Sequence, residues 1–264
     1  MIGYRFTQFG NHDFQIALQT KKIKTEHMTP QEFIEKYRSA FGEKAPLPIV
    51  FGYSDTACCE VHGIPKCMIG EISKVRDKGA LSICKDIVTC RGGGLYGQFT
   101  PMPDGVAKFV SCIEHYKKTE EMVFEYVDSL DLQITEKKYL NFLRVDKISS
   151  FDDFEAILFF ATPDILSGLC SWAFCDSNDE NAVSTLFGSG CSSIISVGTT
   201  ENRNRGKRCF IGMLDPSARL LVPRDELTFT IPMCRFMEML DTMDDSSLFQ
   251  KAFSIVKRRI EGLG

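Results

Sequence analysis

The stretch EAILFFATPDILSGLCSWA, residues 155–173, decides the expected fold. It contains the longest purely apolar run of the chain, Ala156–Ala161, and a short apolar run of this kind predicts a buried β-strand. Pro163 suits the first turn of a helix, and Ile165 and Leu169 follow with the spacing of one apolar helix face. A buried strand that leads directly into an amphipathic helix predicts a sheet covered by helices.

The same order of elements is expected earlier in the chain. Residues 46–53 predict a strand, residues 66–78 predict a helix that Gly79 ends, and residues 80–88 predict a second strand. In the later part, residues 183–187 supply the second strand. We therefore expect an α+β fold, a mixed sheet with packed helices, that contains two degenerate repeats of strand–helix–strand. Chance agreement of short elements is the alternative explanation of this likeness.

The remaining elements complete a single compact domain over residues 1–264. Thr29, Pro30 and Glu32 form a helix start with a capping box. Residues 131–150 are polar and mixed, so the weakest boundary falls there and gives two halves, 1–130 and 140–264. Further helices are expected at 104–116, 120–130, 232–243 and from Ser246 or Ser247 onward, further strands at 208–213 and 226–231, and a surface loop at 199–207.

The composition excludes several classes of protein. Of the 264 residues, 44% are hydrophobic and 25% are charged, which is typical of a globular domain. The net charge of −4 weighs against a nucleic-acid binder. A bilayer span needs about 20 apolar residues, and Met1–Asn11 carry no export signal. We expect a cytoplasmic protein that binds neither nucleic acid nor membrane, takes a small molecule as its partner, and is compatible with a homo-oligomer.

Cysteine is the one outlier of the composition. The chain has 11 cysteines, an odd number, and without an export signal we expect them to be reduced thiols. Free cysteine is among the most buried residue types, so most of these thiols are expected to be small core residues.

Several short motifs resemble a known family. The segments FGSGC at 187–191, GMLD at 212–215 with Arg219, and DELTFTIP at 225–232 resemble the second half of a prokaryotic family, the domain of unknown function 169. The turn CRGGGL at 90–95 resembles its first half, and the resemblance covers roughly residues 45 to 240. It implies one cytosolic, cysteine-bearing mixed domain and no particular reaction.

Two turns that combine glycine with cysteine form the candidate binding site. Gly188, Ser189 and Gly190 lie between an expected strand and an expected helix, where backbone N–H groups can hold an anion. Ser193 occupies the place of the third glycine of a dinucleotide fingerprint, which disfavours a nicotinamide cofactor. The residues assigned to ligand or cofactor binding are Cys90, Gly92, Gly93, Gly188, Gly190 and Cys191. The alternative is that these glycines serve backbone geometry alone, and the identity of any cofactor stays open.

Two further sites involve thiol chemistry. Cys191 is expected in the first turn of a helix, whose dipole lowers a thiol pKa, and His62 is its expected base; these two are the catalytic candidates. The metal candidates are Cys59, His62, Cys67 and Cys90, because thiolate and imidazole suit zinc or an iron–sulfur centre. No Cys-x-x-Cys pair occurs in the chain, which weighs against a zinc ribbon or a ferredoxin-type cluster.

Three hypotheses about function follow. The first is a protein that binds a small ligand or cofactor in a cleft between two pseudo-equivalent halves, near the glycine–cysteine turns. The second is a cysteine-ligated metal or iron–sulfur protein. The third is a non-catalytic interaction protein whose cysteines are core residues. The sequence leaves open whether the chain is an enzyme.

Overall fold

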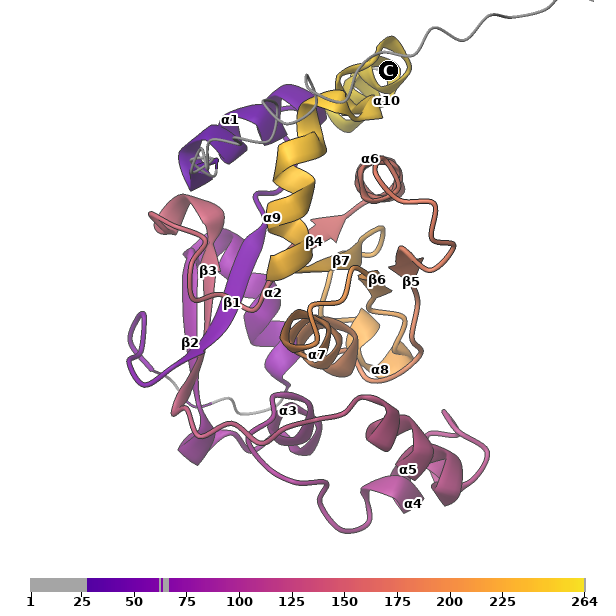
Figure 1. Ribbon diagram of the computed structural model, residues 1–264. Helices are drawn as coiled ribbons and strands as arrows, with labels where there is room; N and C mark the ends of the chain where they lie inside the picture. The colour runs from indigo at the N-terminus through magenta and orange to yellow at the C-terminus, as the bar shows by residue number, and fades with distance from the viewer. Residues whose placement is uncertain (1–27, 62, 64–66, 264) are drawn as a thin grey trace, which may run out of the picture.

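The computed structural model describes residues 28–61, 63 and 67–263, and its strands form one mixed sheet (Figure 1). The sheet order is β2–β3–β1–β4–β7–β6–β5, and every neighbouring pair is antiparallel except β5 and β6. The α+β prediction is therefore confirmed. The strands are β1 Ile49–Ser54, β2 Ala80–Cys84, β3 Tyr139–Arg144, β4 Ala156–Ala161, β5 Val183–Ser184, β6 Cys209–Gly212 and β7 Leu227–Pro232.

Strand β4 lies at the centre of this sheet, as its apolar sequence predicts. It pairs with β1 on one side and with β7 on the other, so Ile157 stands opposite both Val50 and Ile231. Alternate side chains of β4 enter the cores on the two faces, Phe159 on one and Phe160 on the other. Burial on both faces explains why this strand has no polar positions.

Within the described part of the chain, four helices cover one face of the sheet. They are α1 Pro30–Phe41, α6 Pro163–Ala173, α9 Met233–Thr242 and α10 Lys251–Ile260. The expected capping box of α1 is present, because the Glu32 amide donates to Thr29 Oγ1 and the Thr29 amide donates to Glu32 Oε2. The core on this face is aromatic, and Phe236 makes edge contacts with Phe33 and Trp172.

The other face carries a second helical layer, beyond which lies a helical hairpin (Figure 1). The layer comprises α2 Met68–Lys78, α3 Arg91–Tyr96, a π-helical turn Ser192–Ser196 that continues into α7 Val197–Arg203, and α8 Pro216–Arg219. The hairpin comprises α4 Val106–Cys112 and α5 Glu120–Ser129, which pack against each other. Gly79 ends α2 in the left-handed conformation, as expected.

The polar stretch 131–150 contains an unexpected strand. β3 pairs with β1 on one side and β2 on the other, so it joins the sheet of the first half although it follows residue 130. Its apolar residues Leu140 and Phe142 are buried, whereas polar segments precede and follow them. Those flanking polar residues concealed a strand of six residues.

Two expected loops are helical. The turn CRGGGL becomes α3, and the expected loop 199–207 is helical up to Arg203. The glycines of α3 permit close packing: a Cβ at Gly93 would lie 2.9 Å from Met68 Cε, and one at Gly94 would lie 2.9 Å from Thr100 Oγ1. Gly93 and Gly94 are therefore explained by close packing of the helix, whereas the sequence predicted a turn at these glycines.

The two strand–helix–strand segments agree in element order and differ in packing. Helix α2 buries its apolar residues on one face of the sheet, and α6 buries its own on the opposite face. One strand separates β1 from β2, whereas two separate β4 from β5. The likeness between the halves is limited to the order of their elements.

Among the residues that the structure describes, no helix combines the length and apolarity that a bilayer span requires.

Substitutions in α3 should separate helix propensity from packing. Gly92→Ala is expected to stabilise the protein by about 0.5–1 kcal/mol, because the nearest atom to the added Cβ is 3.9 Å away and alanine favours the helix. Gly93→Ala is expected to destabilise it, because the added Cβ would lie 3.3 Å from both Met68 Cβ and Cys90 Cβ, atoms held close to the backbone. Urea denaturation of both variants measures the difference; equal shifts in the same direction would contradict the packing explanation.

Candidate functional site

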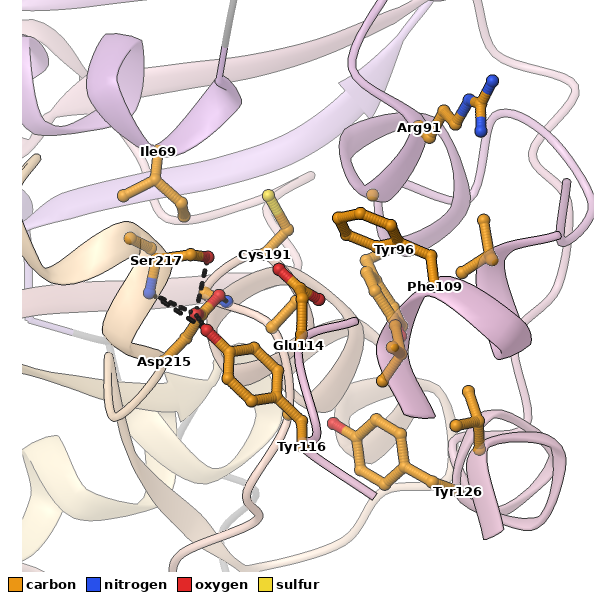
Figure 2. A pocket seen from close by; sticks show the side chains of 18 of the residues that line it. Ile69, Arg91, Tyr96, Phe109, Glu114, Tyr116, Tyr126, Cys191, Asp215 and Ser217 are labelled. Atoms are coloured by element: carbon orange, nitrogen blue, oxygen red, sulfur yellow. Dashed lines mark hydrogen bonds between the residues drawn. The ribbon is translucent and has the colours of Figure 1, made fainter. Parts of the chain in front are cut away.

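A cavity of about 360 Å³ lies between segments from the two halves of the chain (Figure 2). One wall comes from the beginnings of α2 and α3 and from the α4–α5 hairpin. The other comes from the glycine turn 187–191 and from the segment 215–218 at the start of α8. Segments far apart in the sequence therefore converge on a volume within the range of small-molecule sites.

Three cysteine side chains meet at this cavity. Cys67 is the N-cap of α2, Cys90 is the N-cap of α3, and Cys191 directly precedes the π-helical turn. Cys90 lies against the start of α2, because a Cβ at Gly93 would be 3.3 Å from both Met68 Cβ and Cys90 Cβ, and the three thiols influence one another's pKa. Cys191 lies between Ile69 and Tyr96 in Figure 2.

The proximity of Cys67 and Cys90 makes the two thiols unequal in pKa. The pKa of Cys90 is lowered, first by the neighbouring Cys67 thiol and then by backbone amides, including that of Gly93 at 3.3 Å. The pKa of Cys67 is raised, because of its neighbour Cys90 and because it is partly buried. The first proton lost by the pair therefore leaves a thiolate on Cys90.

Cys191 has the opposite character to the one expected. Burial raises the pKa of its thiol, and the neighbouring charges of Cys90 and Asp215 raise it further. The expectation of a lowered pKa at Cys191 is therefore wrong, because the helix start does not compensate for complete burial beside negative groups. Its expected base, His62, lies outside the described residues.

Asp215 ties three segments of the cavity wall together. Its buried carboxylate accepts hydrogen bonds from the Gly190 amide at 2.9 Å, from the Ser217 amide at 2.9 Å and hydroxyl at 2.7 Å, and from the Tyr116 hydroxyl at 3.1 Å (Figure 2). The glycine turn, the start of α8 and the connection between α4 and α5 are thereby held in one arrangement.

The glycines of this turn are needed for packing. A Cβ at Gly188 would lie 1.8 Å from the Tyr126 hydroxyl, and one at Gly190 would lie 3.0 Å from Ile69 Cγ1. The Tyr126 hydroxyl is itself hydrogen-bonded to Ser192 Oγ at 2.8 Å. Both glycines line the cavity and allow the hairpin and α2 to approach the turn closely.

The rest of the lining is largely aromatic, with charged groups among the rings. Glu114 points towards the interior (Figure 2), and its pKa is raised by burial and by the charge of Asp215. The Lys117 ammonium lies 5.1 Å from the centre of the Tyr126 ring. The aromatic lining residues are Tyr96, Phe109, Tyr116, Tyr126 and Phe187.

The structure brings most of the expected binding residues to this cavity. Cys90, Gly92, Gly188, Gly190 and Cys191 line it, whereas Gly93 is buried against Met68. Their role in binding a ligand stays a prediction.

The expected metal ligands are divided between two places. Cys67 and Cys90 line the cavity, whereas Cys59 contacts Ser82 of β2, with 3.8 Å between Sγ and Oγ. Within the described ranges, no group of three His, Cys, Asp or Glu residues is arranged to hold a metal ion. His62 lies outside those ranges. All 11 cysteines are free thiols in the structure.

Sequence reasoning missed several residues of the site. Asp215 precedes Pro216 at a helix start, a pattern that predicts an N-cap but not a link to a glycine turn. Tyr116 lies at the end of the first expected helix of the hairpin, and Tyr126 lies within the second. No sequence signal indicated that these helices would cover the glycine turn 187–191.

Comparison with known proteins confirms the resemblance. The model of the family described as Uncharacterised ArCR, the domain of unknown function 169, matches residues 40–242, more than half of the chain. Neither the curated proteins nor the solved structures gave a significant match.

The thiolate character of Cys90 predicts an unusual pH dependence of alkylation. At pH 6 an ordinary thiol with a pKa of about 8.5 is roughly 0.3% thiolate. Because the pKa of Cys90 is lowered, iodoacetamide should alkylate it at pH 6 about tenfold faster than N-acetylcysteine, with a rate that rises through the lowered pKa and is flat above it. Peptide mass spectrometry against time measures the rate.

The matched variants are Cys67→Ala, which removes the donor, and Cys67→Ser, which retains one. We expect Cys67→Ala to shift the midpoint of the pH profile upward and Cys67→Ser to leave it low. An unchanged profile in Cys67→Ala would show that the neighbouring thiol is not the cause.

The hydrogen bonds that Asp215 accepts predict that replacing one of its carboxylate oxygens lowers the stability of the protein. Asp215→Asn replaces an oxygen that accepts hydrogen bonds with an NH₂ group, so a buried amide or hydroxyl loses its acceptor. The expected cost is about 1–3 kcal/mol in the free energy of unfolding. Asp225→Asn, at an exposed position, is the control and should change stability by less than about 0.5 kcal/mol.

Proposed function

The chain belongs to the family described as Uncharacterised ArCR, and from the geometry of its cavity we propose that it binds a small, largely apolar molecule between its two halves. The observation that carries the proposal is the lining: aromatic rings and aliphatic side chains enclose a space that a few convergent polar groups enter. Pockets of this composition suit small organic ligands and cofactors.

The polar groups indicate how such a ligand is oriented. The thiolate of Cys90 lies at the beginnings of α2 and α3, whereas Glu114, in the α4–α5 hairpin, lies beside the Asp215 network of the other wall. An apolar or aromatic body fits between Tyr96, Phe109 and Tyr126, with its polar group directed to one of these ends. Lys117 offers a positive charge beside Tyr126 for an anionic substituent.

The alternative functions receive less support from these contacts. A structural role for the cysteines fits Cys209, whose buried sulfur contacts the Met239 sulfur at 3.9 Å. It does not account for Cys67 and Cys90, which line a cavity and remain partly exposed. The binding hypothesis explains both the cavity and the position of these thiols.

An apolar anionic dye tests this proposal. We expect 1-anilinonaphthalene-8-sulfonate to bind to the folded chain with an increase in fluorescence, because its rings match the aromatic lining. Val110→Trp, which fills the space beside α4, should weaken binding at least about tenfold, equivalent to about 1.4 kcal/mol. Fluorescence titration with excitation of the dye alone measures the change.

The matched control places the same side chain elsewhere. Ile255→Trp adds a tryptophan to an exposed position of α10, across the sheet from the cavity, and should leave the dye affinity unchanged. Equal affinities of the wild type and Val110→Trp would overturn the cavity as the binding site.

A further inference from the structure

We propose that Cys67 and Cys90 form a reactive dithiol that exchanges with low-molecular-weight disulfides, with Cys90 as the attacking sulfur and Cys67 as the resolving sulfur. This inference goes beyond binding of an apolar ligand, since it requires only that a small disulfide reach the two sulfurs. It names a reaction, its substrate class and the role of each thiol.

The first argument is the position of the two sulfurs. Cys67 and Cys90 begin two different helices whose starts are packed together, because a Cβ at Gly93 would lie 3.3 Å from both Met68 Cβ and Cys90 Cβ. Cys67 directly precedes Met68, so both cysteines lie at one point of the wall, and the exchange brings their sulfurs to the S–S length of about 2.05 Å. Both residues are partly exposed and line the cavity, so a small molecule can reach them there.

The second argument is the asymmetry of the pair. The neighbouring Cys67 thiol and the Gly93 amide, which donates to the sulfur of Cys90 at 3.3 Å, both lower the pKa of Cys90. Cys67 retains its proton, because its neighbour Cys90 and partial burial raise its pKa. A thiolate beside a protonated thiol is the arrangement that disulfide exchange needs, because the thiolate attacks first and the thiol resolves second.

The third argument is the contrast with other cysteines. Cys191 and Cys209 are buried and have raised pKa values, which disfavours their reaction. Cys112 and Cys175 are exposed and provide reference thiols within the same chain. The pair at the cavity combines access with a stabilised thiolate.

The exchange balances in two steps. The Cys90 thiolate attacks one sulfur of R–S–S–R, so a Cys90–S–R bond forms, the original S–S bond breaks, and the first R–S⁻ leaves and takes a proton from water. Cys67 then gives its proton to solvent and attacks Cys90 Sγ, which forms the Cys67–Cys90 disulfide and expels the second R–S⁻. The small disulfide is reduced to two thiols, and the protein dithiol supplies the two electrons.

The test uses one equivalent of 2,2′-dithiodipyridine on the full reduced chain at pH 6. For each chain that reacts, we expect two pyridine-2-thione molecules, measured by absorbance, and a linked peptide pair containing Cys67 and Cys90, identified by mass spectrometry. Cys67→Ser should release one thione and keep a pyridyl mixed disulfide on Cys90. Cys90→Ser should react at least about tenfold more slowly.

Two controls keep the outcome decisive. Cys112→Ser should behave like the wild type, and far-ultraviolet circular dichroism checks that every variant is folded. Preferential modification of Cys112 or Cys175, or a wild-type reaction that stops at a mixed disulfide on Cys90, would overturn the proposal. Dye binding without exchange would support the proposed ligand site and refute the dithiol. Exchange without dye binding would support the dithiol and refute the proposed ligand site.

Discussion

The short antiparallel contact between β1 and β4 is the interaction on which the rest of the structure depends. It joins strands from the two halves over three residue pairs, from Ile49 opposite Leu158 to Phe51 opposite Ala156. Pairing stops where the chain before β4 crosses Gly52, at which a Cβ would lie 2.7 Å from the Asp153 carbonyl oxygen. Because Gly52 has no side chain, the chain can cross here and the sheet stays continuous. The segments that follow β1 and β4 in sequence meet on the far side of this crossing and enclose the cavity.

The elements that could be predicted are those whose signals are local. The apolar run of β4, the capping box of α1 and the stop at Gly79 each follow from a few adjacent residues, and the structure confirms them. β3 could not be recognised, because its burial depends on β1 and β2, strands that precede it by more than fifty residues. Helix α3 was hidden for a related reason, since Gly93 and Gly94 are required by the close approach of Met68 and Thr100.

The candidate site shows the same division. Sequence reasoning identified Cys90 and Cys191 beside glycines, and both line the cavity. It could not assign their chemistry, because that depends on neighbours brought by folding: Cys67 supports a negative charge on Cys90, whereas burial and Asp215 oppose one on Cys191. Residue type and helix position were therefore insufficient, and the hydrogen-bond partners of each sulfur decided the outcome.

Trp172, the single tryptophan of the chain, reports on only one side of the molecule. It is fully buried on the face covered by α1, α6 and α9, and its indole N–H donates to the Met239 carbonyl at 2.9 Å. Its surroundings lie across the sheet from the cavity, in a different core. Intrinsic emission therefore follows the integrity of that aromatic layer and is optically silent towards events among the three thiols, so folding and site chemistry can be recorded as separate signals from one sample.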